Sequence, residues 1–261
     1  MGCTAGVTVT RLTTAAVKGT RVRSVPEIEL GALGARGDRA FYVIDEGGRM
    51  LNGKQIGELQ AVQAEWDPAA GELSMSFPDG RLAGGQVQYG ETLDTRFFSR
   101  RYRARRLEGP WAQALSEFVG RPVRLVEPAE PAVDRGRQGA ASLISRASLG
   151  RLAEAAQADR VDPRRFRMLI EVDGLSAHEE DSWVGAQVRI GSALAAMHGH
   201  VGRCLVTSRD PESGEIDLPT LDLLGRYRRE EDSTEPLPFG IYGEVLEAGT
   251  VRVGDPVTMD H

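Results

Sequence analysis

The sequence predicts a mainly β protein of the α+β class, with a β-barrel-like unit in the first half, a second β-barrel after it and a few short helices. Two patterns indicate this class. Short apolar runs alternate with Gly- and Pro-rich turns along most of the chain, and only three segments show the apolar spacing of a helix. The 261 residues are 41% hydrophobic and 27% charged, which is typical of a globular protein with one large domain or two modest ones.

The first third predicts antiparallel strands joined by tight turns. RAFYVIDEGGRMLN, at 39–52, places an Asp-Glu-Gly-Gly turn between two short strands, which is the pattern of a hairpin. The segment 61–88 repeats it, and Leu73, Met75 and Phe77 alternate with polar residues on a half-buried strand. We therefore expect an antiparallel meander or barrel.

A helix and a Pro-rich segment follow. Pro110 opens a predicted helix in which Trp111, Leu115 and Phe118 share one face, and Trp111 is expected in the core. Residues 126–141, VEPAEPAVDRGRQGAA, are rich in Pro, Gly and charge without any period, so they predict a linker or a mobile loop. The expected domains are therefore 1–125 and 142–261.

The second half predicts short strands and two helices. Ser145 is the expected N-cap of the first helix, and the second lies around PTLDLLGRYRR. The expected strands are RMLIEV, QVRIG, CLVTS, FGIYGEV and GTVRVGDPV. His198 and His200 are expected on one face of a further strand. Gly-rich turns between these runs favour a barrel.

Net charge and cysteine content narrow the possible partners and compartments. A net charge of −6 argues against nucleic acid, although the segment 96–106 holds six arginines interleaved with aromatic residues. We expect those arginines to pair with surface carboxylates. The two cysteines are too few for a disulfide framework, the start lacks a signal peptide, and no apolar run is long enough to cross a membrane. The sequence therefore predicts a cytoplasmic protein with no membrane partner.

Cys204 is the residue with the most distinctive chemistry. Zinc is disfavoured, because His198, His200 and Cys204 have no second ligand pair. Cys204 would then be a buried apolar thiol, a soft-metal ligand or a nucleophile, and the charge of Arg203 would favour its thiolate. The acidic segment HEEDSW offers Asp181 as a candidate proton donor.

Several sequence blocks resemble a known family. FRMLIEV, HEEDSWVGAQVRIGSA, GRCLVTSRDPESGE, LDLLGRYRR and FGIYGEVLEAGTVRVGDPV follow the order found in the MOSC domain, the C-terminal domain of molybdenum-cofactor sulfurases. AAVKGTRV and ALGARGDRAFYVIDEGGRMLNGKQIGELQAV resemble the β-barrel domain that precedes MOSC in the amidoxime-reducing family. The resemblance spans roughly residues 7–257.

This resemblance implies a molybdenum-pterin cofactor and specific residues to hold it. Cys204 matches the family's molybdenum ligand and would be the catalytic residue. The positions implied to bind the cofactor are Lys18, Gly19, Arg39, Arg167, Gly202 and Arg203. The chain departs from the family where Gly19 replaces a serine, where Met168 and Leu169 replace Pro-Asn, and where Gln138-Gly139-Ala140 replace a segment with Thr-Ser.

The resemblance implies an oxotransferase that reduces small N-hydroxylated or N-oxide substrates. The chain has no ferredoxin-type cysteine run, so electrons would come from a separate reductase or ferredoxin-type protein. It also lacks the lysine-bearing pyridoxal phosphate domain of a full sulfurase, so pyridoxal phosphate binding is not expected. A persulfide sulfur carrier acting through Cys204 and a non-catalytic molybdenum-cofactor carrier are the alternatives.

Overall fold

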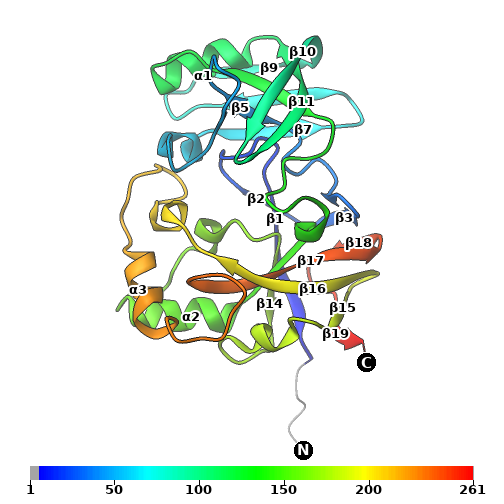
Figure 1. Ribbon diagram of the computed structural model, residues 1–261, viewed down its shortest axis with the longest axis vertical. Helices are drawn as coiled ribbons and strands as arrows, with labels where there is room; N and C mark the ends of the chain where they lie inside the picture. Colours follow the sequence, from blue (N-terminus) through cyan, green and yellow to red (C-terminus); the bar gives the residue numbers. More distant parts are fainter. Residues whose placement is uncertain (1–5, 261) are drawn as a thin grey trace, which may run out of the picture.

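A computed structural model of the protein describes residues 6–260 and confirms the mainly β class. Within this range the strands form four open sheets, none of which closes into a barrel, together with three α-helices. Figure 1 shows two lobes stacked along the longest axis of the molecule. We call the part built from the strands between residues 42 and 128 the upper lobe, and the part built from the remaining strands the lower lobe.

The lower lobe contains the largest sheet and a small three-stranded one. The eight-stranded sheet runs, in spatial order, β19 (Val257–Asp260), β15 (Gln187–Ile190), β16 (Ala193–Gly202), β17 (Pro238–Glu247), β13 (Ala141–Ser145), β14 (Ile170–Asp173), β1 (Thr8–Thr14) and β2 (Arg23–Val25). The small sheet consists of β18 (Gly249–Arg252), β3 (Glu27–Gly31) and β4 (Gly34–Ala35). The α-helices of this lobe are α2 (Arg146–Ala155) and α3 (Thr220–Tyr227).

The upper lobe contains two antiparallel sheets and one helix. The five-stranded sheet consists of β10 (Gln88–Phe97), β11 (Arg100–Glu108), β12 (Arg124–Pro128), β5 (Tyr42–Ile44) and β6 (Met50–Leu51). The meander consists of β7 (Gln63–Asp67), β8 (Glu72–Ser76) and β9 (Leu82–Gln86), and α1 (Trp111–Val119) packs beside it. The described residues also contain five short 3₁₀ helices: η1 (Gly57–Ala61), η2 (Gly136–Gly139), η3 (Pro163–Phe166), η4 (Glu179–Trp183) and η5 (Leu205–Ser208).

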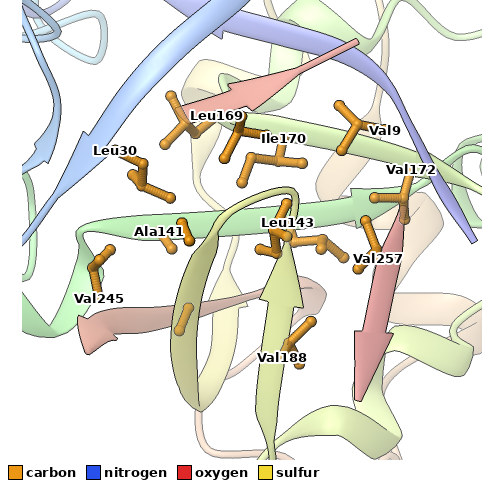
Figure 2. Packing of buried hydrophobic residues seen from close by; sticks show 14 of the residues in the cluster. Val9, Leu30, Ala141, Leu143, Leu169, Ile170, Val172, Val188, Val245 and Val257 are labelled. Carbon is orange, nitrogen blue, oxygen red and sulfur yellow. The ribbon is translucent and has the colours of Figure 1, made fainter. Parts of the chain in front are cut away.

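The lower lobe is assembled from both ends of the chain. β1 pairs antiparallel with β14, with Thr8 opposite Asp173, and β3 pairs with β18, with Ile28 opposite Val251. Burial of apolar side chains stabilises this pairing. Figure 2 shows Val9 and Leu30 in the same buried cluster as Leu143, Ile170 and Val188. The first strands therefore share a core with the C-terminal half, and the division into units 1–125 and 142–261 stays a prediction.

The three predicted helices are present, and their ends follow the expected chemistry. Trp111 is 1% exposed and its indole N–H donates to the carbonyl of Leu73 at 3.0 Å, so this residue belongs to the core as predicted. Gly120 ends α1 in the left-handed conformation, with φ 68°. The Ser145 side chain accepts a hydrogen bond from the backbone N–H of Ser148 and caps α2.

Two local predictions were wrong. The segment CLVTS forms the 3₁₀ turn η5 rather than a strand. The segment 126–141 stays a predicted linker or mobile loop, although β12 continues to Pro128 and η2 covers Gly136–Gly139. His198 and His200 do not share an environment: the register of β16 shifts beside Met197, which leaves His198 exposed and His200 buried. Among the described residues, no helix is long and apolar enough to cross a membrane.

Candidate functional site

A pocket of about 470 Å³ lies where the two lobes meet. Residues from the loop after β1, from the β6–η1 connection and from the tip of the β10–β11 hairpin line it, together with residues from the lower lobe. All seven residues predicted for the site lie in its wall: Lys18, Gly19, Arg39, Arg167, Gly202, Arg203 and Cys204. The fold therefore brings together groups that are up to 186 positions apart in the chain.

Lys18 is a nearly buried cation with one acidic partner. Only 9% of its side chain is exposed, its ammonium group donates to Asp134 at 2.5 Å, and it lies 5.2 Å from the centre of the Phe97 ring. Burial lowers the pKa of Lys18, Asp134 opposes this effect, and the charge of Arg39 adds to it. Desolvation acts to raise the pKa of Asp134, but the charge and hydrogen bond of Lys18 together with the charges of Arg39 and Arg135 outweigh it and hold that pKa below its usual value.

Arg39 and Arg167 form a linked pair with unusual backbone geometry. Both adopt left-handed conformations, with φ 50° and 55°, which are uncommon for residues other than glycine. The Arg39 guanidinium pairs with Asp38 and donates to the carbonyl of Arg167 at 2.9 Å. Nη2 of Arg167 is buried and has no hydrogen-bond partner among the described residues. Burial, followed by the charge of Arg39, lowers the pKa of Arg167 to about 10.

Arg203 holds the loop that carries Cys204 against neighbouring segments of the lower lobe. Its guanidinium donates to the carbonyls of Phe239 and Phe166, the latter at 3.0 Å, and to the sulfur of Met168 at 3.0 Å. Burial lowers the pKa of Arg203 to about 9, and the neighbouring Cys204 opposes this shift. Since arginine keeps its proton at neutral pH, the lowered pKa reflects the cost of burying a positive charge, which an anionic ligand would relieve.

Cys204 is a partly exposed free thiol in the pocket wall. Its backbone is extended, and its carbonyl accepts hydrogen bonds from the N–H and the hydroxyl of Thr207, so the turn η5 fixes its position. Gly202, two residues earlier, is the last residue of β16. A Cβ at Gly202 would lie 3.0 Å from the backbone carbonyl oxygen of Pro236, so a larger residue there would require the neighbouring backbone to shift.

The pocket is strongly positive although the whole chain carries a net charge of −6. Only two carboxylates line it, Asp134 and Glu235. Seven cationic side chains line it: Lys18, Arg39, Lys54, Arg135, Arg165, Arg167 and Arg203. Arg39 pairs with Asp38 and Arg165 with Asp217, two carboxylates outside the lining, so the surplus of positive charge is three. A concentration of charge in a hollow surface raises the local potential and attracts anions.

Sequence reasoning missed part of this wall. Asp134 and Arg135 come from the segment predicted as a linker, and the sequence signal was only that this segment is rich in charge. Asp181 is not among the residues that line the pocket: its carboxylate pairs with Arg228 instead, so the suggested proton donor was wrong. At the positions that depart from the family, Met168 lines the pocket, whereas Leu169 is buried in the core.

Comparison with known proteins agrees with the two-part pattern of the sequence. The MOSC N-terminal beta barrel domain matches residues 6–122, and the MOSC domain matches residues 130–258. Mitochondrial amidoxime reducing component 2 of Bos taurus is 30% identical to this chain over 285 residues, covering 96% of this chain and 82% of the relative. The chain belongs to the MOSC family.

Two further relatives show the range of this MOSC family. Mitochondrial amidoxime-reducing component 1 of Danio rerio is 29% identical, covering 95% of this chain and 83% of the relative. Molybdenum cofactor sulfurase of Oryza sativa subsp. japonica is 25% identical over 88% of this chain, which spans 32% of that protein. The amidoxime-reducing relatives are named as mitochondrial proteins, and the cytoplasmic location of this MOSC protein stays a prediction.

The residues of the pocket fit an anionic, metal-containing cofactor. The unpartnered Nη2 of Arg167 and the surplus of positive charge in the pocket wall call for an anion, such as the phosphate of a pterin cofactor. A thiolate such as that of Cys204 is a soft ligand suited to metals of this kind. Gly19 offers no hydroxyl, but Ser142, whose hydroxyl accepts from the backbone N–H of Leu169, lines the same wall.

Proposed function

We propose that this MOSC protein binds a molybdenum-pterin cofactor and reduces N-hydroxylated or N-oxide compounds. The observation that carries the proposal is the accessible thiol of Cys204 in a pocket with a surplus of positive charge. The amidoxime-reducing relatives support the choice of substrate class. The proposal also assigns the seven predicted residues: Cys204 as the metal ligand, and Lys18, Gly19, Arg39, Arg167, Gly202 and Arg203 as residues that hold the cofactor.

The bound cofactor would supply oxygen-atom transfer from nitrogen, and the overall change is R₂N–OH plus two electrons and two protons to R₂N–H plus water. The protein's own contribution is binding and orientation. Lys18, Arg39 and Arg167 would neutralise the anionic groups of the cofactor, since buried cations gain most from a buried anion. Arg203 fixes the loop that presents Cys204, because its guanidinium is bonded to two backbone carbonyls.

Apolar side chains also line the pocket, among them Val133, Phe166 and Val206, and an uncharged aromatic or aliphatic amidoxime would pack against them. Electrons would come from a separate reductase or ferredoxin-type protein, because no described group in the pocket carries redox chemistry of its own apart from the thiol.

The metal content of the purified protein tests this proposal. We expect about one molybdenum per chain in protein from a cofactor-producing host, and loss of most of this metal in Cys204→Ser. Cys3→Ser makes the same chemical change at the other cysteine and should keep the metal. The readouts are molybdenum by plasma mass spectrometry and pterin by fluorescence after oxidation. A wild-type protein with neither metal nor pterin would contradict the proposal and direct attention to a persulfide on Cys204.

Turnover then separates an enzyme from a cofactor carrier. Protein that contains molybdenum should reduce benzamidoxime to benzamidine with reduced methyl viologen as the electron donor, and Cys204→Ser should lose this activity. Molybdenum-loaded protein that shows no turnover with several amidoximes and N-oxides would be a carrier.

A further inference from the structure

The arginine-rich segment of the sequence forms a hairpin whose tip reaches the pocket. β10 and β11 are connected at residues 98–99, and Figure 1 shows their hairpin in the upper lobe with its tip directed towards the junction of the lobes. Phe98, at the tip, lines the pocket and remains 49% exposed. Its backbone is left-handed, with φ 53°, a strained state for a bulky residue.

Three arginines lie side by side next to this tip. Arg96 is directly opposite Arg101 across the hairpin, and a parallel bridge places Arg49 beside Arg96 on its other side. We call Arg49, Arg96 and Arg101 the arginine row. Like charges directly opposite one another destabilise a sheet, so local stability does not account for this arrangement.

The three members of the arginine row form no salt bridge within the described part of the chain, and neither do Arg100 and Arg103 on the same hairpin, whereas Arg105 and Arg106 do. Arg105 pairs with Glu127, and Arg106 pairs with Glu91 and Glu108, so the predicted pairing with carboxylates holds for these two. Within residues 6–260 no carboxylate forms a salt bridge with any member of the arginine row. All three side chains are exposed, which leaves a positive patch at the pocket mouth.

We propose that the arginine row and Phe98 form the docking surface for the acidic face of a one-electron donor protein. This inference rests on the proposed function, because the pocket needs electrons and no donor is built into its walls. Each docked donor would be oxidised by one electron, so two successive donors supply the pair that the reduction consumes, and water supplies the two protons. The arginine row would steer the donor, and Phe98 would be the aromatic anchor at the centre of the contact.

A protein partner explains the patch better than nucleic acid does. A nucleic-acid surface needs positive charge along an extended groove, whereas Asp94 lies on the same strand face as Arg96. The row is compact and is situated at the mouth of the pocket that holds Cys204, which is where a short electron path requires the donor. The next depression along the surface, lined by Arg49, Arg96 and Phe98, is small at about 140 Å³, so it favours contact with a partner surface over capture of a separate small molecule.

Binding of a defined acidic donor tests the proposal without the cofactor. The probe is an oxidised plant-type [2Fe–2S] ferredoxin, titrated into the full chain by calorimetry at about 20 mM ionic strength and again at about 200 mM, where the Debye length is roughly threefold shorter. The triple variant Arg49→Gln, Arg96→Gln, Arg101→Gln should raise the Kd at least about tenfold and flatten its salt dependence. Because it relieves like-charge contacts, this variant should keep the thermal stability of the wild type.

The matched control removes the same charge elsewhere. Arg121, Arg226 and Arg229 are exposed and form no salt bridge among the described residues, so the triple Gln variant at these positions should bind ferredoxin within about twofold of the wild type. Phe98→Ala should weaken binding without changing its salt dependence. Absence of binding by the wild type, or equal losses in both triple variants, would overturn the proposal.

Kinetics separate this inference from the proposed function. In molybdenum-loaded protein, the row variant should raise the KM for reduced ferredoxin about tenfold and leave benzamidoxime reduction with methyl viologen unchanged. If the molybdenum-loaded wild type did not reduce benzamidoxime with methyl viologen, the proposed function would be contradicted. The calorimetry would still show whether the arginine row binds ferredoxin. Tighter binding of a single-stranded oligonucleotide, lost in the same variant, would assign the row to nucleic acid and refute the proposal.

Discussion

Arg167 is the residue whose surroundings most directly call for a ligand. It is held in a left-handed backbone conformation, one terminal nitrogen is buried without a partner, and its carbonyl is already used by Arg39. A buried donor left unsatisfied costs about 1–3 kcal/mol, more when it is charged. The unliganded protein therefore carries a local instability that an anion can remove.

Inorganic phosphate should stabilise the protein through this group. At a phosphate concentration about five times Kd, mass action adds about 1 kcal/mol, which corresponds to a rise in Tm of roughly 2–4 °C. Arg167→Gln should reduce this rise by at least half, while Arg229→Gln, at an exposed position outside the pocket, should keep it. Differential scanning fluorimetry with phosphate and with chloride at matched ionic strength measures the effect. Equal shifts in all three proteins would contradict a phosphate subsite at Arg167.

His178 should make the stability depend on pH. Burial, followed by the charges of Arg228 and Arg151, lowers the pKa of His178 from 6.5 to about 4. Between pH 6.5 and 4 the unfolded chain therefore binds a proton that the folded chain does not, so stability is complete above pH 6.5 and is lost as the pH falls towards 4.

The size of this effect is about 1–2 kcal/mol, after allowance for the partial exposure of the ring. His178→Asn removes the titration and keeps a residue that tolerates the left-handed backbone, φ 64° at this position. Urea unfolding at pH 7 and pH 4.5 should therefore show a smaller loss of stability on acidification in the variant. A loss as large as that of the wild type would place the acid sensitivity elsewhere.

At the scale of elements, α2 is positioned by a buried network at its first turn. The hydroxyl of Ser145 accepts from the N–H of Ser148, and the hydroxyl of Ser148 donates to Glu180 at 2.7 Å. Glu180 also accepts from the backbone N–H of Ser145, which ties the helix start to η4. Burial raises the pKa of Glu180 in spite of these hydrogen bonds. The start of α2 therefore links β13 with η4.

Loss of this cap should destabilise the whole lower lobe. Ser145→Ala removes the capping oxygen and one neighbour of Ser148, and we expect the free energy of unfolding to fall by about 1–2 kcal/mol. Ser176→Ala, at an exposed position whose side chain makes no recorded hydrogen bond, should change it by less than about 0.5 kcal/mol. Chemical denaturation followed by circular dichroism compares the two. If Ser145→Ala lowered the free energy of unfolding by less than about 0.5 kcal/mol, the Ser145 hydroxyl would not be needed to position α2.

Local patterns predicted the helices and most strands, because their signals lie within about ten residues. Trp111, Ser145 and Gly120 behave as their types predict. The strand predicted through Cys204 failed, since an apolar run of this length is compatible with a strand or with a turn packed on the core. The turn η5 is stabilised by burial of Thr207 and by the hydrogen bond from its hydroxyl to the carbonyl of Cys204. Neither feature can be recognised in the sequence.

The candidate site was found through a resemblance, not through composition. The cations of the pocket are scattered in sequence, and only the family pattern singled them out. Asp134 and Arg135 escaped because a charged, aperiodic segment gives no sign of which side chains point inward. The pairing of β1 with β14 was also not predicted, because a periodic pattern within one segment does not show which distant strand will pair with it.

At the scale of the whole molecule, the halves of the chain depend on each other. Val9, Leu12, Ile28 and Leu30 fill the same core cluster as strands from the second half, and the pocket needs walls from both lobes. The fragments 1–125 and 126–261, expressed separately, should therefore each lack a cooperative thermal transition. Co-expression should restore one, as read by circular dichroism and size-exclusion chromatography. A fragment that unfolds cooperatively alone would establish it as an independent domain.

The pairing of β1 with β14 also bears on synthesis of the protein on the ribosome. Thr8 cannot meet Asp173 until the intervening chain has been made, which takes roughly 8–30 s at about 5–20 residues per second. During this wait the strands between 42 and 128 pair only with one another, apart from isolated bridges, so the upper lobe can form first. The nascent N-terminal strand meanwhile stays without its partner, which makes this interval the one in which a chaperone would matter most.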